Sequence, residues 1–232
     1  MVTRGFYLNG LVAALLCAAG SAAFAAGAGQ VQNMSGTLTV QRPDGAIRIL
    51  GQKSDVNPGD VLTTQKDSYA QINMTDGSSM TLRPNTQVKI ENYQFVQEKP
   101  QEDNAFFRLV KGGLRTVTGL VGKRGNQDAY RIGTATATIG IRGSGGATEN
   151  NENGDCQDCG NLGRGVYHHT YTGAYSIKND VETVVVGEGE FAHVKDKTSP
   201  ISVTQTNPGM KLEDFDKMLV SISNIGNGCL VR

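Results

Sequence analysis

Short alternating segments separated by glycine-containing turns fill most of this chain. Between Gly36 and Thr206, apolar and β-branched residues recur at every second position, and glycine interrupts the pattern at short intervals. A period of two is typical of strands with one buried face, whereas a helix repeats every ~3.6 residues. The 30 glycines and the absence of tryptophan also fit a chain rich in turns. The sequence therefore predicts an all-β domain over residues 30–206.

Two hairpins can be placed from their turn residues. Pro43-Asp44-Gly45 separates two alternating runs, and proline followed by glycine suits a tight turn. Asp76-Gly77 separates residues 68–75 from residues 78–82 and is a favoured two-residue hairpin turn. In residues 68–75, Ala70, Ile72 and Met74 alternate with polar side chains, so this hairpin should bury one apolar face.

The middle of the chain predicts longer strands. Residues 106–118 are apolar and β-branched but are broken at Gly112-Gly113, where we expect a bulge or a sharp bend. Residues 130–141 read as one long strand, in which Ala135, Ala137 and Ile139 alternate with threonines. Residues 143–165 are rich in Gly, Asn and Cys with almost no apolar residue, so we expect an exposed, partly mobile insertion.

The β pattern resumes over residues 166–177, 183–194 and 201–206. The recurring unit of strand, turn and strand fits either a β-solenoid or a β-sandwich of short antiparallel strands. Residues 207–232 form a tail that begins at Pro208-Gly209. Within it, apolar residues at helical spacing predict a short C-terminal helix over residues 211–223.

The N-terminus has the features of an export signal. A single cation, Arg4, precedes an apolar stretch over residues 6–26 that ends in small residues. This pattern is typical of a secretory signal peptide, here residues 1–25. Cleavage would leave no stable membrane span and would place the protein in the periplasm or outside the cell. Retention of the segment as an anchor is the alternative, because about 20 apolar residues can span a bilayer.

Charge disfavours nucleic acid as a partner. The whole chain has 22 Lys and Arg against 22 Asp and Glu, and loss of Arg4 with the leader leaves 21 against 22. Nucleic-acid binding needs an excess of positive charge on one face, which this balance does not provide.

Cys156 and Cys159 are separated by two residues, a spacing that suits a disulfide, a metal site or a redox pair. A disulfide is favoured in an oxidising compartment. A redox pair is disfavoured because Asp155 and Asp158 would raise the pKa of the thiols rather than lower it. A metal site would also need His168 or His169, and their side chains point to opposite faces of a strand. Cys229 leaves the pairing open.

No pattern of catalytic residues is recognisable. The serines and histidines form no nucleophile elbow or metal-binding helix, and His193 lies on a predicted strand. The glycines of residues 140–146 lack the lysine that a phosphate-binding loop requires. We therefore expect no enzyme activity, no catalytic or metal-binding residue and no cofactor.

Several motifs, taken in order, resemble the FecR domain, a periplasmic module found in the ferric citrate regulator and in many exported bacterial proteins. They cover about residues 36–148. The matching segments are GTLTV at 36–40, PGDVLTT at 58–64, AQI at 70–72 with DGS at 76–78, MTLRPNT at 80–86, FRL at 107–109 with GGLR at 112–115, and ATIGIRG at 137–143.

The resemblance implies an exported, all-β, non-catalytic interaction module whose motif residues are structural. Those residues are Gly59, Asp60, Asp76, Gly77, Gly140, Arg142 and Gly143. We expect Arg142 to hydrogen-bond to neighbouring carbonyls or to a carboxylate. The partner would be an envelope protein or a cell-wall component. A membrane-anchored signalling regulator of the ferric citrate type and a metal or redox protein using Cys156 and Cys159 remain the alternatives.

Overall fold

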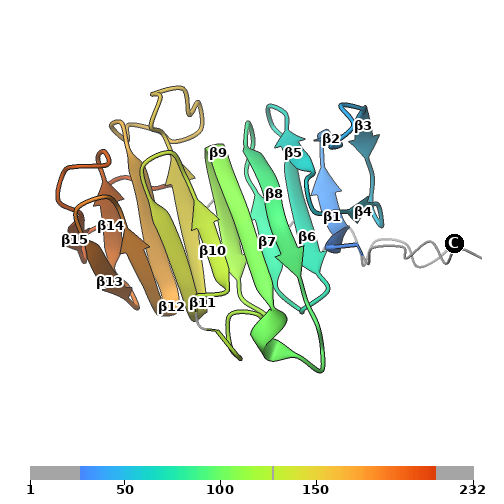
Figure 1. Cartoon of the computed structure of the whole chain (residues 1–232). Helices are drawn as coiled ribbons and strands as arrows, with labels where there is room; N and C mark the ends of the chain where they lie inside the picture. Colours follow the sequence, from blue (N-terminus) through green and yellow to red (C-terminus); the bar gives the residue numbers. More distant parts are fainter. Residues whose placement is uncertain (1–26, 127, 213–232) are drawn as a thin grey trace, which may run out of the picture.

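The computed structural model describes residues 27–126 and 128–212, which form one open mixed sheet (Figure 1). The all-β prediction is confirmed, since the helical structure in these residues is one short 3-10 turn, η1 (Pro100–Glu102). The strands are β1 (Gly29–Ser35), β2 (Leu38–Gln41), β3 (Ile47–Leu50), β4 (Asp55–Val56), β5 (Val61–Thr64), β6 (Tyr69–Met74), β7 (Ser79–Leu82), β8 (Gln87–Gln94), β9 (Asn104–Val117), β10 (Tyr130–Gly133), β11 (Thr138–Asn150), β12 (Val166–Lys178), β13 (Thr183–Gly187), β14 (Phe191–Val194) and β15 (Ser202–Thr204).

The strand pairings form two facing layers that share β9, β11 and β12. The first layer has the strand order β3-β2-β5-β8-β9-β10-β11-β12-β13, and the second layer has the order β4-β1-β6-β7-β9-β11-β12-β14-β15. One apolar core contains side chains from both layers, such as Leu62 and Phe107 from the first layer and Ile72 and Met80 from the second. The alternation seen in the sequence therefore serves to direct one face of each layer into this shared core.

Three long strands belong to both layers because each turns back on itself at a glycine. The first half of β9 pairs with β8 and β10, and its second half pairs with β7 and β11. Gly112 lies at this turn with a φ of 83°, and Gly143 in β11 and Gly173 in β12 have φ values of 68° and 74°. Side chains other than glycine rarely adopt this left-handed region. The fold thus combines the facing layers of a sandwich with the winding path of a solenoid.

The predicted turns are confirmed. Asp76-Gly77 joins β6 to β7, Pro43-Asp44-Gly45 joins β2 to β3, and the chain bends at Gly112. Ala70, Ile72 and Met74 are buried.

The long strand predicted over residues 130–141 is wrong. β10 ends at Gly133, residues 134–137 form a turn, and β11 begins at Thr138 and pairs antiparallel with β10. The turn is held by the carboxylate of Glu152, which accepts hydrogen bonds from the backbone N–H of Thr136 at 2.7 Å and the hydroxyl of Thr134 at 2.9 Å. This partner lies outside the alternating segment, so its local pattern could not reveal the turn.

The insertion predicted over residues 143–165 is much shorter than expected. Ser144 to Asn150 continues β11 as a buried strand between β9 and β12, and the loop itself covers residues 151–165. The small residues Gly145, Gly146 and Ala147 fit between the neighbouring strands. Gly146 packs so closely that an added Cβ would lie 2.8 Å from the hydroxyl of Tyr175. The polar composition of residues 144–150 therefore predicted a loop where the structure has a buried strand.

The predicted signal peptide and nearly all of the predicted C-terminal helix lie outside the described residues. Within residues 27–126 and 128–212, no helix is long and apolar enough to cross a membrane.

The turn of β9 gives a direct test of the two-layer path. An added Cβ at Gly112 would lie 2.5 Å from the Thr86 hydroxyl oxygen, whereas one at Gly45, with a φ of 86°, would meet nothing within 4 Å. Both Gly112→Ala and Gly45→Ala impose a strained φ that costs about 1 kcal/mol, and the clash adds about 1–3 kcal/mol at Gly112 alone. Urea unfolding should show this difference, and equal losses would contradict the tight turn.

Candidate functional site

Gly59 and Asp60 fix the turn that leads into β5. Gly59 has a φ of 88°, and its N–H donates to the carbonyl of Ile90 at 2.6 Å. The buried carboxylate of Asp60 accepts a hydrogen bond from the N–H of Asn57 at 2.7 Å and forms an ion pair with Arg42. Burial raises the pKa of Asp60 above its usual value, although the hydrogen bond and Arg42 oppose that shift. These contacts hold the chain rather than present a reactive group.

Asp76 links three segments at the other end of the layers. Its buried carboxylate accepts hydrogen bonds from the N–H of Ser78 at 3.0 Å, the hydroxyl of Tyr93 at 3.0 Å and the N–H of Val121 at 3.1 Å. Gly77 beside it has a φ of 82°. The hairpin turn is thereby tied to β8 and to the loop before β10.

Gly140, Arg142 and Gly143 lie on the first half of β11 and at its turn. Gly140 faces Ser176 of β12, whose hydroxyl oxygen would lie 2.6 Å from an added Cβ. The Arg142 side chain is exposed, and its guanidinium makes no hydrogen bond or ion pair with the residues that the structure describes. The Arg142 side chain is thus exposed among the described residues, and the hydrogen bond expected from the sequence stays a prediction.

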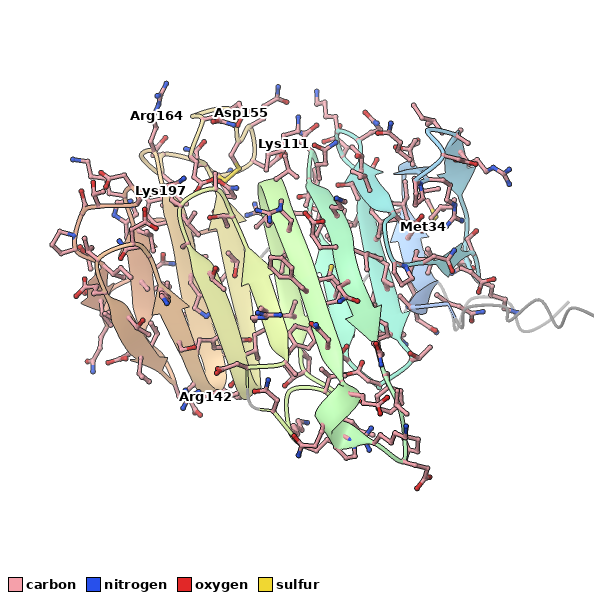
Figure 2. All side chains as sticks on the ribbon, in the orientation of Figure 1. Met34, Lys111, Arg142, Asp155, Arg164 and Lys197 are labelled. Carbon is pink, nitrogen blue, oxygen red and sulfur yellow. A yellow bond between two sulfur atoms is a disulfide. The ribbon has the colours of Figure 1, made fainter. Side chains whose placement is uncertain are left out.

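A groove of about 640 Å³ lies on the outer face of the first layer, over the neighbouring parts of β10, β11, β12 and β13. Four cationic side chains line it: Arg131, Arg142, Lys178 and Lys197. Gly140 and Ser176 also line it, so the absence of a side chain at Gly140 leaves space on the sheet between the cations. Figure 2 shows Arg142 at the lower end of the strands and Lys197 toward the upper end.

Arg131 is held in place within this groove. Its guanidinium carbon lies 5.3 Å from the centre of the Phe106 ring, within the range of a cation–π contact. The ring in turn packs over Gly133, where an added Cβ would lie 2.9 Å from it. A preordered cation loses less conformational freedom on binding.

The groove chemistry favours recognition of anions. Its acidic lining residues are Asp128 and Asp180, so the cations outnumber them, and the lining contains no His, Cys or Glu. Guanidinium groups bind carboxylates in a bidentate manner, and ammonium groups add charge. The arrangement can therefore bind an acidic ligand.

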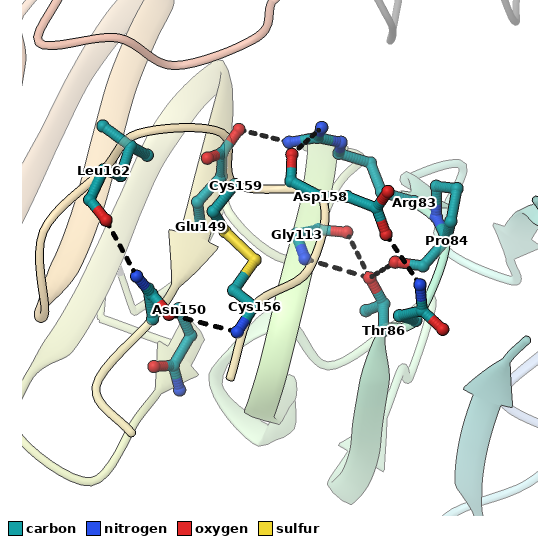
Figure 3. The surroundings of a disulfide bond; sticks show 12 residues. Arg83, Pro84, Thr86, Gly113, Glu149, Asn150, Cys156, Asp158, Cys159 and Leu162 are labelled. Carbon is teal, nitrogen blue, oxygen red and sulfur yellow. Dashed lines mark hydrogen bonds and ion pairs between the residues drawn. A yellow bond between two sulfur atoms is a disulfide. The ribbon is translucent and has the colours of Figure 1, made fainter. Parts of the chain in front are cut away.

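The loop of residues 151–165 packs against second-layer residues of β11, β12 and β14. Figure 3 shows the surroundings of its disulfide. A disulfide joins Cys156 and Cys159, with their Cα atoms 5.4 Å apart. Cys159 is buried in a small apolar cluster with Ala147, Leu162, Tyr167, Phe191 and Met210. Because both thiols are used in the disulfide, neither can bind a metal as a thiolate. Cys229 lies outside the described residues.

A buried ion pair anchors this loop to the core. Arg83, after β7, pairs with Glu149 of β11, and both side chains are almost fully buried. Arg83 also donates to the carbonyl oxygen of Asp158 at 2.9 Å, and Asn85 donates to the Asp158 carboxylate at 2.8 Å. The disulfide loop is therefore packed in place and is not a free recognition arm.

The two adjacent histidines face opposite sides of β12, as the strand pattern predicts. His168 is buried between the layers, where its ring lies 4.2 Å from that of Tyr175 and its Nδ1 is 3.0 Å from the Thr148 hydroxyl. His169 instead stacks on Phe191, with 4.2 Å between the ring centres. Within residues 27–126 and 128–212, His, Cys, Asp and Glu form no group of three that could hold a metal ion.

Sequence reasoning missed Arg83, Glu149 and Glu152. Arg83 and Glu149 are 66 positions apart, and no local pattern links them. Glu149 and Glu152 lie in a polar stretch whose composition predicts exposure. Their carboxylates are paired with Arg83 and with the turn at Thr134 and Thr136, which only the tertiary fold brings close.

Removal of the buried cation should be costly. Arg83→Met leaves the carboxylate of Glu149 buried without this partner, and the free energy of unfolding should fall by about 3–5 kcal/mol. Arg108→Met removes the more exposed ion pair with Glu91 and should cost less than about 1 kcal/mol. Urea unfolding checks both values. The Arg83→Met/Glu149→Leu double variant should recover most of the loss, and a mild effect of Arg83→Met would contradict the assigned burial.

Acid should weaken the fold through His168. Burial lowers the pKa of His168 to about 3, from an ordinary value of 6.5, and nearby His169 adds to this shift. The unfolded chain therefore binds this proton as pH falls below about 6.5, while the folded chain resists it until about 3. Between about pH 7.5 and about pH 5, His168 should account for a loss of about 2 kcal/mol. His168→Gln should reduce the pH dependence of unfolding by that amount, and an unchanged dependence would contradict neutral burial.

Comparison with known proteins gives a family match. Residues 60–157 match the sequence model of the FecR protein family. No match was found among curated proteins. Two solved structures are each described as a "putative anti-sigma factor from Parabacteroides distasonis". They are 11% and 12% identical to this chain, with TM-scores of 0.48 and 0.46. The similar regions cover 68% and 62% of this chain, and they cover 64% and 58% of the two solved chains, which is less than two thirds of either solved chain.

The family match confirms the resemblance drawn from the sequence motifs: this chain carries a FecR domain.

Proposed function

We propose that this protein is an exported, non-catalytic recognition protein of the bacterial envelope, in the periplasm or outside the cell, and that it binds an acidic segment of a partner protein. The observation that carries the proposal is the groove on the outer face of the first layer. Its four cations surround space on the sheet, and Arg142 belongs to the ATIGIRG motif of the FecR domain.

The charges that line the groove support an acidic partner. Arg142, Lys178 and Lys197 are exposed, so an incoming carboxylate can reach them without displacing an internal carboxylate. Hydrogen bonds to charged groups contribute about 1.5–3 kcal/mol each, more than neutral ones. The neighbouring Ser176 and Thr138 can hydrogen-bond to a peptide backbone.

Two further features agree with export. The N-terminal sequence has the composition of a signal peptide, and a disulfide is at home in an oxidising compartment. A membrane-anchored signalling regulator is the second candidate, favoured by the FecR match itself. The N-terminus of the exported protein separates the two candidates, because cleavage near Ala26 favours a free recognition protein and an intact Met1 in the membrane favours the regulator.

Binding can be tested by capture from envelope extract with tagged mature protein. Arg142→Glu should lower recovery of the partner on the order of tenfold, because it removes a charged contact and adds repulsion. Arg164→Glu makes the same charge change on the loop at the far end of the strands and should leave recovery unchanged (Figure 2).

The identity of the captured material decides the ligand class. An acidic protein that a polyglutamate peptide displaces would support the proposal. Recovery of cell-wall glycan, or equal recovery by both variants, would contradict it.

A further inference from the structure

Both ends of the first layer are open edge strands. β3 pairs with β2, and β13 pairs with β12, and neither has a second partner among the described strands. An edge strand presents a row of unpaired N–H and C=O groups that can extend a sheet into another chain. Figure 1 shows β3 and β13 at opposite ends of the molecule.

Both edges also expose apolar side chains. Ile47 and Ile49 of β3 are 71% and 76% exposed, and Val185 of β13 is 64% exposed. The two strands have four and five residues, so their lengths are closely matched. Soluble proteins usually protect strand edges with charge or cover them, and exposed branched residues leave these two edges apolar enough to pair with another strand.

The charges next to the two edges are complementary. Residues 41–54, around β3, contain Arg48 and Lys53 as exposed cations against one acid, Asp44, whereas Arg42 is paired with the buried Asp60. Residues 179–190, around β13, contain Asp180, Glu182, Glu188 and Glu190 and no Lys or Arg. Lys178 and Lys197 lie beside Asp180 in the groove, so the acidic end of this edge is the end after β13, at Glu188 and Glu190. Arg48 is exposed on β3, and Glu188 is exposed directly after β13. Like edges would repel each other, while unlike edges would attract.

We infer that a second copy of this chain docks its β13 edge against the β3 edge of the first, so that the first layers of successive copies form one continuous sheet. Because the joining surfaces differ and lie at opposite ends, the contact is head-to-tail and adds copies in a row. Backbone hydrogen bonds and the contact of Ile47 and Ile49 with Val185 hold the junction, and the charges select its orientation. The groove shares Asp180 and Thr183 with this edge, but the inference is argued from the open strand edges and does not use the cations of the groove.

The mature full-length protein tests this by sedimentation over a concentration series. We expect the average mass to rise with concentration beyond that of a dimer. Ile49→Lys and Val185→Lys, on opposite edges, should each reduce the protein to a monomer. Val110→Lys replaces an exposed valine of β9, away from both edges, and should assemble like the wild type. Circular dichroism and thermal unfolding confirm that each variant is folded.

Mixing the two edge variants gives the sharpest test. Ile49→Lys retains an intact β13 edge and Val185→Lys retains an intact β3 edge, so an equimolar mixture should form a dimer that stops there. A wild-type protein that stays monomeric at every concentration would overturn the inference. So would a dimer that depends on Ile49 and not on Val185, since that result would indicate a symmetric contact between two β3 edges.

Discussion

The reversal of three strands at left-handed glycines is the constraint on which the rest of the fold depends. Gly112, Gly143 and Gly173 allow β9, β11 and β12 to leave one layer and return through the other. Each reversal places two halves of one strand on opposite sides of the same core. The apolar face of every segment can then be buried without helices, which explains how a chain with little helical pattern reaches a closely packed interior.

The buried polar groups follow from the same geometry. Where strands reverse, neighbouring turns meet at the ends of the layers, and their backbone groups need partners. Asp76 supplies hydrogen bonds at one end, and Arg83 with Glu149 joins the other end to the disulfide loop. These charged residues form contacts inside the fold and are therefore not free to bind a ligand. The cations of the groove are different, because Arg142, Lys178 and Lys197 remain on an outer face where they can meet a ligand.

The sequence reveals the parts of this structure that are set by neighbours along the chain. The hairpin at Asp76-Gly77 and the bend at Gly112 depend on local backbone preferences, and the alternation of Ala70, Ile72 and Met74 identifies their buried face. The turn at residues 134–137 and the buried half of β11 depend on Glu152 and Arg83, which come from distant segments. The polar composition of residues 144–150 therefore predicted a loop, although tertiary contacts make this segment part of a strand.

The candidate site was only partly visible in the sequence for the same reason. Gly140 and Arg142 stand out as motif residues, but the groove also needs Lys178 and Lys197, which the winding of the chain brings alongside them. No spacing rule links residues 142 and 197. The motif identified the module, and the fold shows that its arginine faces outward among other cations.

Photo-crosslinking in intact cells tests the central claim, that the outer face of the first layer is the recognition surface. A photoreactive residue at Thr138, which is exposed in the groove, should crosslink to one partner protein, whereas the same residue at Asn73, which is exposed on β6 of the second layer, should not. A partner crosslinked from Asn73 and absent from Thr138 would contradict the account.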